Sequence, residues 1–451
     1  MRALTLPQYA QYNKTVKTAY MGILALLLLT LPASGDTYQP YTYQLPSGMT
    51  VILAPIPGMQ ATCVFTYHKT GVRHDPPAIR GASFLYQYLM LLATENLEDY
   101  DRLMFVRKNG GESNVRVGND YSYFSQLIPD HTISNALWLE SERLTSLLFL
   151  NPSVNAQKDN LVKRLSALLQ QNTLFNAQEW VRAKVMEKTI YQEPVFGSIE
   201  TLRNLDNRSI RSRYPVFQHP ENIILVICGS LKMRETISLI HDHFKLPRNG
   251  TALKPERFHS IPPRKKGIEE TWTVADTNLN SVIYGFRTPG LISRDYTAFQ
   301  LIETFLTDPR VSHLDRILNQ NNHLNIQISR ESTQLIESNA LIFKISSPSR
   351  LAIEKASYLV DRLLSALVSG KLSGNDLRQT RILMEIDSKK VRLNPEASAL
   401  NYARQYHMFG AKGRPQSEKE ELSALTILDI HQVCREYLSP ENRVILNVYK
   451  K

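Results

Sequence analysis

A short segment occurs twice in this chain, and its two copies lie far apart. The first copy, His219-Pro-Glu-Asn-Ile-Ile-Leu-Val-Ile227, leads into an apolar run, and the second, Ser439-Pro-Glu-Asn-Arg-Val-Ile-Leu-Asn447, does the same near the C-terminus. An apolar run of this length after a turn signal is typical of a buried strand. Because each copy stands at the end of one half of the chain, we expect a duplicated architecture.

The two expected halves are separated by a stretch rich in proline and basic residues, 251–267, which we interpret as an interdomain linker. The N-terminal domain is then 36–250 and the C-terminal domain is 268–451. With 451 residues, the chain is long enough for two domains with substantial cores.

Both halves mix strand-like and helix-like patterns. Short apolar or alternating runs predict strands, and longer runs with a 3.6-residue period predict helices. The expected strands are 41–45, 49–53, 61–67, a pair within 115–127, 222–228 and 281–286, and the expected helices are 81–94, 133–150, 154–172, 233–244 and 295–305.

Residues 1–35 have the pattern of a secretory signal peptide. Three basic residues and no acid accompany an apolar run, 21–31, that is too short for a comfortable transmembrane helix. Small residues at 33–35 then offer a cleavage site. We therefore expect a periplasmic or secreted protein, and an uncleaved segment would serve as an inner-membrane anchor.

Charge and cysteine usage narrow the possible partners. Without residues 1–35 the chain keeps 50 Lys and Arg against 42 Asp and Glu, a formal charge of +8. The basic residues are dispersed, so we expect no nucleic-acid partner. Cys63, Cys228 and Cys434 are too few and too scattered for a disulfide framework. The first two lie in apolar runs, where buried small hydrophobes are expected.

The segment from Thr70 to Thr94 carries the most specific pattern. It reads Gly71-Val-Arg-His-Asp-Pro-Pro-Ala-Ile-Arg-Gly-Ala-Ser-Phe-Leu-Tyr-Gln-Tyr88 and resembles the active-site segment of the insulinase-like (pitrilysin) zinc metallopeptidases, G-S-R-x-E-P-P-x-x-x-G-L-A-H-F-L-E-H. Downstream, 109–121 is similar to that family's G-G-x-x-N-A-x-T-x-x-D-x-T strand, and 136–143 is similar to its A-L-x-L-E-A-D-R helix. The residues in register are Gly71, Arg73, Pro77, Gly81, Ala82, Thr94 and Asp120.

The resemblance implies an α+β fold with two homologous halves. Each half should be a mixed β-sheet covered by helices, and the halves should face each other across a chamber. In the family, two histidines four apart on one helix bind zinc, and the glutamate beside them polarises the attacking water. A third ligand, a glutamate, comes from a later helix.

At these positions the chain carries other residues. Phe84 and Tyr88 stand at the histidine positions, Gln87 at the catalytic glutamate, and Leu165 at the third ligand. Phe84 has no lone pair for zinc, Gln87 cannot accept a proton at neutral pH, and Tyr88 would be an unusual ligand. We therefore expect no catalytic residue, no metal ligand and no cofactor, although zinc is the cofactor of the family.

In family heterodimers the subunit without zinc offers an arginine and a tyrosine from its second half. The matching stretch here is 312–326, where Asn319 replaces the arginine and Ile326 replaces the tyrosine. Arg316 lies nearby but out of register. This pattern favours a scaffolding role over substrate clamping.

Peptide binding could survive these losses. The strand near Asn114, Val115 and Arg116 matches the family's edge strand, which pairs with extended substrates through main-chain hydrogen bonds that tolerate side-chain change. The alternative is an ordinary edge strand without a ligand.

Three functions follow from the resemblance. The leading one is a non-catalytic partner or scaffold subunit of an active homologous zinc peptidase in the cell envelope, within a heterodimer. The second is a stand-alone peptide-binding envelope protein. The third is an active zinc metalloendopeptidase with unconventional ligands, which predicts bound zinc and chelator-sensitive cleavage.

Overall fold

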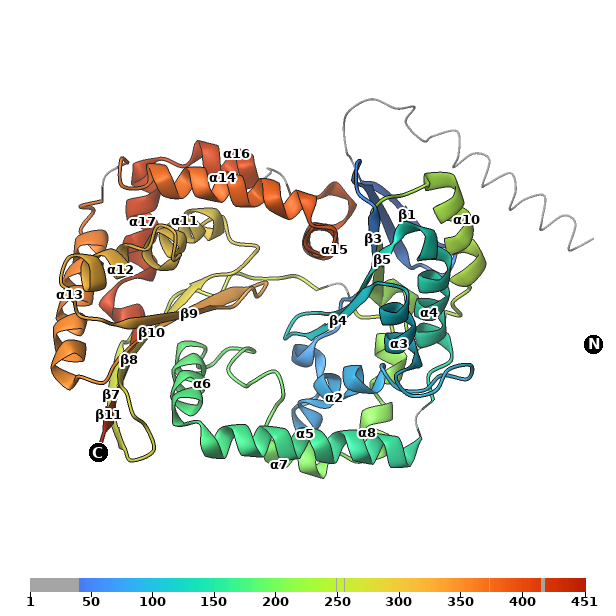
Figure 1. Ribbon diagram of the computed structural model, residues 1–451, viewed down its shortest axis with the longest axis horizontal. Coiled ribbons are helices and arrows are strands. Elements are labelled where there is room, and N and C mark those ends of the chain that lie inside the picture. Colours follow the sequence, from blue (N-terminus) through green and yellow to red (C-terminus); the bar gives the residue numbers. More distant parts are fainter. Residues whose placement is uncertain (1–39, 149, 249, 255, 373, 415–417) are drawn as a thin grey trace, which may run out of the picture.

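Two β-sheets, each covered by helices, form the two sides of the molecule (Figure 1). The computed structural model describes residues 40–451 apart from 149, 249, 255, 373 and 415–417, so the expected signal peptide lies outside the described residues. Within that described part, no helix is both long enough and apolar enough to span a bilayer.

The first sheet has the strand order β1-β2-β6-β3-β5-β4, with β4 at one edge. β2 and β6 are parallel and the other neighbours are antiparallel, so the sheet is mixed. Its strands are β1 (Tyr41–Gln44), β2 (Thr50–Pro55), β3 (Ala61–His68), β4 (Glu112–Val117), β5 (Ser122–Pro129) and β6 (Ile223–Gly229).

The second sheet repeats this topology. Its order is β7-β11-β8-β10-β9, and its parallel pair, β7 with β11, corresponds to β2 with β6 in the first sheet. Every strand from β7 to β11 therefore has a counterpart among β2 to β6, which confirms the predicted two homologous halves. The strands are β7 (Ile268–Val274), β8 (Asn280–Pro289), β9 (Gln327–Ser332), β10 (Ser338–Ser347) and β11 (Arg443–Lys450).

The repeated Pro-Glu-Asn segment has the same physical role in both halves. Asn222 and Asn442 are buried just before β6 and β11. The side-chain amide of Asn222 donates to the carbonyl oxygen of Val216 at 2.7 Å and its oxygen accepts from the N–H of Leu253 at 2.9 Å. Asn442 likewise accepts from the N–H of Arg264 at 2.8 Å. The two asparagines thus hold the predicted linker near both of its ends.

Helices cover both sheets. On one face of the first sheet, α4 and α10 close an apolar core, and α11, α13 and α17 do the same for the second sheet. The helices of the first half are α2 (Ala82–Leu89), α3 (Asp101–Lys108), α4 (Ile133–Thr145), α5 (Asn151–Gln171), α6 (Thr173–Val185), α7 (Ile199–Asn204), α8 (Asn207–Arg211), α9 (Tyr214–Phe217) and α10 (Met233–His243). Those of the second half are α11 (Tyr296–Thr307), α12 (His313–Asp315), α13 (Arg350–Val368), α14 (Arg378–Leu393), α15 (Pro395–Phe409), α16 (Glu418–Ala424) and α17 (Ile427–Tyr437).

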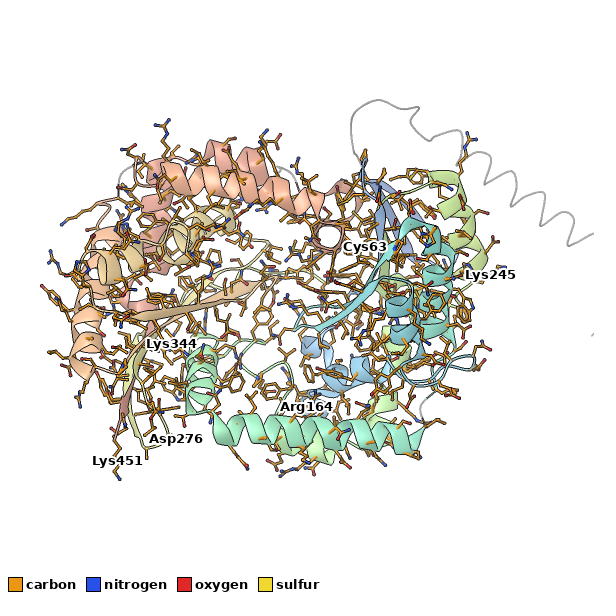
Figure 2. All side chains as sticks on the ribbon, in the orientation of Figure 1. Cys63, Arg164, Lys245, Asp276, Lys344 and Lys451 are labelled. Carbon is orange, nitrogen blue, oxygen red and sulfur yellow. The ribbon has the colours of Figure 1, made fainter. Side chains whose placement is uncertain are left out.

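The opposite faces of the sheets are covered by helices exchanged between the halves. α15 places Ala399 and Ala403 against the first sheet, next to the buried Cys63 (Figure 2). α6 places Ala177 and Val181 against the second sheet. The central strands are apolar on both faces, so each sheet needs a cover on both sides. We call the first sheet with its helices and α15 the first lobe, and the second sheet with its helices and α6 the second lobe.

The fold class expected from the sequence is confirmed. Two expected helices are shorter than the periodicity indicated: the helix expected over 81–94 ends at Leu89, and that over 133–150 ends at Thr145. The reason is a tertiary contact, since Thr94 forms isolated β-bridges with Leu97 and Leu147, which draw the chain out of both helices. The division of the sequence at 251–267 stays a prediction, and α6 and α15 pack across it.

Candidate functional site

The start of α2 is fixed by a buried carboxylate. Gly81 has a φ of 96°, and a Cβ at this position would lie 2.5 Å from the carbonyl oxygen of Phe196, so only glycine fits. Asp75 accepts hydrogen bonds from the backbone N–H of Gly81 and of Ser83, both at 3.0 Å, and pairs with Arg213 at 3.1 Å. Burial raises the pKa of Asp75, against the effect of Arg213. This cap positions the helix that carries the former metal positions.

The structure brings three of the four former metal positions into one region. The rings of Phe84 and Tyr88 meet edge to face with centroids 5.4 Å apart, and Phe84 and Phe196 do so at 6.5 Å. Phe84 and Leu165 pack against the same apolar cluster between α2 and α5. Arg164 extends from α5 (Figure 2), and its guanidinium lies 5.9 Å from the ring centre of Tyr88. Packing between side chains occupies the place where the family holds a metal ion.

Gln87 lies on the same helix, at the position of the family's glutamate. The donor set at these positions does not fit a zinc ion, because Phe84 and Leu165 have no donor atom and Gln87 carries an amide. Among the residues that the structure describes, no group of three or more His, Cys, Asp or Glu side chains could hold a metal ion.

The predicted peptide-binding residues lie on β4, which pairs only with β5 among the described strands. The N–H of Gly118 donates to Tyr121 at 2.9 Å, and the alternation of an antiparallel ladder then leaves the N–H of Val115 on the open edge. That N–H donates to the side-chain oxygen of Asn114 at 3.1 Å. Asn114 and Arg116 are exposed. The strand therefore has the geometry that accepts a further strand.

Two cavities extend from this edge into the space between the lobes. One, of about 320 Å³, is lined by Arg116 and, from β9, by Glu331. The other, of about 640 Å³, is lined by Arg116 and Arg330. α15 also approaches β4, because the amide of Asn114 donates to Glu396 at 3.3 Å. The edge strand thus borders a chamber to which both lobes contribute.

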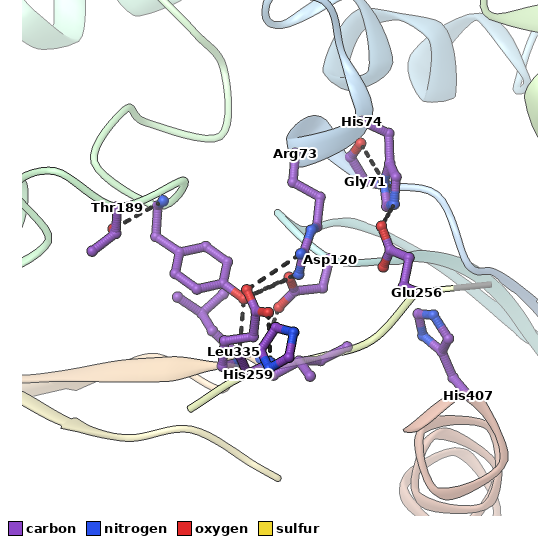
Figure 3. A network of polar contacts seen from close by, with 12 residues as sticks. Gly71, Arg73, His74, Asp120, Thr189, Glu256, His259, Leu335 and His407 are labelled. Atoms are coloured by element: carbon purple, nitrogen blue, oxygen red, sulfur yellow. Dashed lines mark hydrogen bonds and ion pairs between the residues drawn. The ribbon is translucent and has the colours of Figure 1, made fainter. Parts of the chain in front are cut away.

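A buried polar network connects the lobes at the base of this chamber (Figure 3). Arg73 donates to Asp120 at 2.7 Å and forms an ion pair with Glu337 at 3.3 Å. Asp120 also accepts from the hydroxyl of Tyr191 at 2.8 Å and from the backbone N–H of Ile336 at 2.9 Å. Burial and the neighbouring Asp120 raise the pKa of Tyr191, so its hydroxyl keeps its proton and donates. We call these five residues the interlobe network.

The predicted linker joins the interlobe network. The N–H of His259 donates to Glu337 at 2.9 Å, and the ring of His74 contacts the carboxylate of Glu256 at 3.0 Å. Burial raises the pKa of Glu256, but the hydrogen bond and charge of His74 outweigh it and leave that pKa below its ordinary value. The linker is therefore attached to both lobes by charged groups.

Sequence reasoning found only part of the interlobe network. Arg73 and Asp120 matched family positions without an assigned role, and Tyr191 and Glu337 were missed. No local pattern marks them, because Tyr191 lies 71 residues from Asp120 and Glu337 lies 264 residues from Arg73. The matches of Arg73 and Asp120 to the family pattern were the sequence features that could have indicated this network.

Asn319 and Ile326 stand where the family's zinc-free subunit has its arginine and tyrosine, and both residues form contacts within the second lobe. The amide of Asn319 donates to the carbonyl oxygen of Ile326 at 2.9 Å and its oxygen accepts from the N–H of Ile326 at 2.7 Å. The Ile326 side chain is buried in the core of the second lobe. Asn319 and Ile326 thus shape a turn of the second lobe.

Known proteins with a similar sequence or fold are peptidases and a domain of the M16 peptidases. The family described as "Peptidase M16 inactive domain" matches residues 204–384. "Zinc protease PqqE" of Helicobacter pylori is 19% identical over 375 residues, covering 81% of this chain and 84% of that protein. The crystal structure of a protease from Helicobacter pylori aligns with a TM-score of 0.83 at 16% identity, over 91% of this chain and 99% of that one.

The periplasmic protease PqqL from Escherichia coli aligns with a TM-score of 0.72 at 14% identity. This alignment covers 92% of the present chain but 48% of PqqL. The fold and these matches define a two-lobed homologue of the M16 peptidases. Residues 204–384 match that M16 family, the fold along nearly the whole chain is that of the M16-like peptidase structures, and the sequence lacks the H-x-x-E-H motif.

Proposed function

We propose that the protein is a non-catalytic M16 homologue that serves as a partner or scaffold subunit of an active zinc peptidase in the cell envelope. The observation that carries the non-catalytic role is the packing of Phe84, Tyr88 and Leu165 at the former metal position. These side chains supply neither a general base nor a ligand set, so peptide hydrolysis by the family's mechanism lacks its reacting groups.

The partner role is supported by the size relation to PqqL. The chain aligns along nearly its whole length but with about half of that periplasmic protease, at 48% coverage. In PqqL, a region of the size of this chain is therefore accompanied by another region of comparable length. We extend this to the present chain as a heterodimer with a homologue that keeps H-x-x-E-H, and we assign both to the periplasm or the cell exterior.

The partnership is tested with residues 36–451 and a purified homologue from the same genome that carries intact H-x-x-E-H. The proposal expects a complex in analytical ultracentrifugation and a higher kcat/KM of the homologue toward peptides when this chain is present. A homologue whose sedimentation and activity are the same with and without this chain would contradict the partner role.

Zinc analysis of the same preparation, purified without added metal, separates this proposal from an active peptidase. We expect zinc far below one ion per chain and no cleavage of unstructured peptides. Zinc near one per chain, together with cleavage stopped by a chelator, would establish the third function, a peptidase with unconventional ligands.

A second candidate function, stand-alone peptide binding, is favoured by the open edge of β4. The sharpest test is Val115→Pro, which removes the N–H on the open edge and leaves the bonds from β4 to β5 intact. Val115→Thr is the matched control, because it keeps that N–H. If peptides add to β4, the proline variant should bind about tenfold more weakly than the control, measured by fluorescence anisotropy.

A further inference from the structure

A further cavity lies outside the chamber, at one end of the first sheet. Its volume is about 500 Å³, and none of the residues that line it comes from β4 or β5. Its wall is formed by the ends of β1, β2 and β3, by the segment just before β6, by Arg248 and the predicted linker that follows it, and by α15. Its lining includes Lys69, Arg248, Lys254, Glu256, Phe258 and His407.

Lys69 follows β3 and is the partly buried cation of this cavity. Its ammonium donates to the backbone carbonyl oxygen of Glu221 at 3.0 Å and lies 5.9 Å from the ring centre of Tyr406. An ammonium group has three protons to donate, and within the described part of the chain this carbonyl is its hydrogen-bond acceptor. Burial lowers the pKa of Lys69, because the ammonium loses hydration that neighbouring groups do not fully replace.

His407 presents a further donor from α15. The hydroxyl of Tyr67 contacts Nδ1 of this ring at 2.8 Å, and burial raises the pKa of Tyr67 well above its ordinary value. Burial and the nearby Lys69 lower the pKa of His407 to about 3, so the ring is neutral. In the tautomer in which Tyr67 donates to Nδ1, the proton of the neutral ring stands on Nε2 and can be donated to a ligand.

Positive charge exceeds available negative charge around the cavity. Arg248 and Lys254 are exposed at its margin, and the guanidinium of Arg248 also donates to the carbonyl oxygen of Ser47 at 3.2 Å. Of the two carboxylates, that of Glu256 is bound by His74, and Figure 3 shows His407 extending toward it. The other is Glu221, whose charge opposes the effect of burial on the pKa of Lys69, so three cations face two carboxylates. Leu253 and Phe258 add apolar surface to the wall.

From this arrangement we propose that the cavity binds a small organic anion, whose carboxylate or phosphate oxygens accept from Lys69 and His407 while Arg248 and Lys254 attract it electrostatically. The volume and the apolar wall fit a molecule larger than an inorganic ion. Because the wall joins the first sheet, the linker and α15, a bound anion contacts segments from both halves of the sequence. This site is separate from the proposed peptide-binding edge and does not depend on it.

The test is isothermal titration of residues 36–451 with citrate and with inorganic phosphate, against sodium chloride of equal ionic strength. We expect citrate to bind and to raise the melting temperature, and Lys69→Met to weaken its binding at least about tenfold. Lys355→Ala, on the exposed face of α13, is the control for general loss of positive charge and should bind like the wild type.

A second variant tests the proposal independently, in case Lys69→Met does not fold. Arg248→Ala combined with Lys254→Ala alters only exposed side chains and should also weaken citrate binding, with an unchanged melting temperature in the absence of citrate. The absence of citrate and phosphate binding by the wild type would overturn the proposal. Equal citrate affinity of the wild type and of both folded variants would overturn it as well.

Discussion

The former metal position and the interlobe network differ in how closely they follow the family pattern. At the former metal position, Phe84, Tyr88 and Leu165 have replaced charged or metal-binding groups with rings and an aliphatic side chain. In the interlobe network, Arg73 and Asp120 keep the residues of the family pattern and are joined by 2.7 Å. The difference teaches that the chemistry and the architecture of this fold rest on separate side chains, so one can be lost while the other persists.

The largest expected effect comes from breaking the interlobe network at its centre. Asp120→Ala removes the acceptor of Arg73, Tyr191 and the N–H of Ile336 and leaves a mostly buried guanidinium without its main partner. We expect a loss of about 3–5 kcal/mol in the free energy of unfolding, measured by urea denaturation. Asp242→Ala, on the exposed side of α10, is the control and should be close to neutral. Similar midpoints for both variants would refute the architectural role of the network.

Truncation at the former metal position should cost less. Phe84→Ala removes two edge-to-face contacts from a partly buried cluster, for which we expect about 2 kcal/mol, below the range for fully buried phenylalanines. Leu168→Ala, an exposed leucine farther along α5, provides the control and should cost much less. A stabilised Phe84→Ala variant would show that this region is still strained for a function that the packing does not explain.

Lowering the pH should reduce the free energy of unfolding through buried histidines such as His407. The apolar packing around Phe84 should not contribute to this loss. His407 has a folded-state pKa of about 3, below an unfolded value of about 6.5, so the unfolded chain binds more protons between these values. The contribution of neutral His407 to the free energy of unfolding is complete above about pH 6.5. It is lost as the pH falls toward 3, by at most about 1.4 kcal/mol per pH unit.

The charged groups around this ring are Lys69, Glu256, His74 and Arg73. Buried His68, with a pKa of about 3, adds a loss of the same sign. His407→Gln should therefore flatten the dependence of the urea midpoint on pH between 6.5 and 4 without removing it, since His68 remains. An identical slope for wild type and variant would exclude His407 as a source of acid sensitivity.

The smallest expected effect concerns a single hydroxyl of the network. Tyr191→Phe removes the hydrogen bond that the hydroxyl donates to Asp120 at 2.8 Å and the longer ones, both at 3.3 Å, that it accepts from Arg73 and from the N–H of Glu337. We expect a loss of about 1 kcal/mol in the free energy of unfolding. Tyr43→Phe is a matched control, because the buried hydroxyl of Tyr43 has no hydrogen-bond partner among the described residues. The control should be neutral or slightly stabilising, and a loss equal to that of Tyr191→Phe would show that the network hydroxyl is not special.

Local pattern predicted the elements of the fold well and the site in part. The strand at 222–228 was predicted because its apolar run is nearly continuous, and that at 41–45 because it precedes a turn signal at 46–48. The repeated Pro-Glu-Asn precedes the last strand of each sheet. The exchange of α6 and α15 between the lobes was not predicted, since their periodicity indicates an apolar face but not the sheet that it covers. The placement of Phe84 and Leu165 in one cluster came from the family resemblance.

The sequence by itself determined a duplicated α+β architecture, a resemblance to the insulinase-like peptidases, and the presence of Phe84, Gln87, Tyr88 and Leu165 at the positions of that family's zinc site. These facts depend on residue identity and spacing along the chain. Only the tertiary structure decided that Tyr191 and Glu337 complete the interlobe network and that Lys69 and His407 face one cavity. The physical reason is distance along the chain: hydrogen bonds and cavities form between segments hundreds of residues apart, and no local pattern records which segments meet.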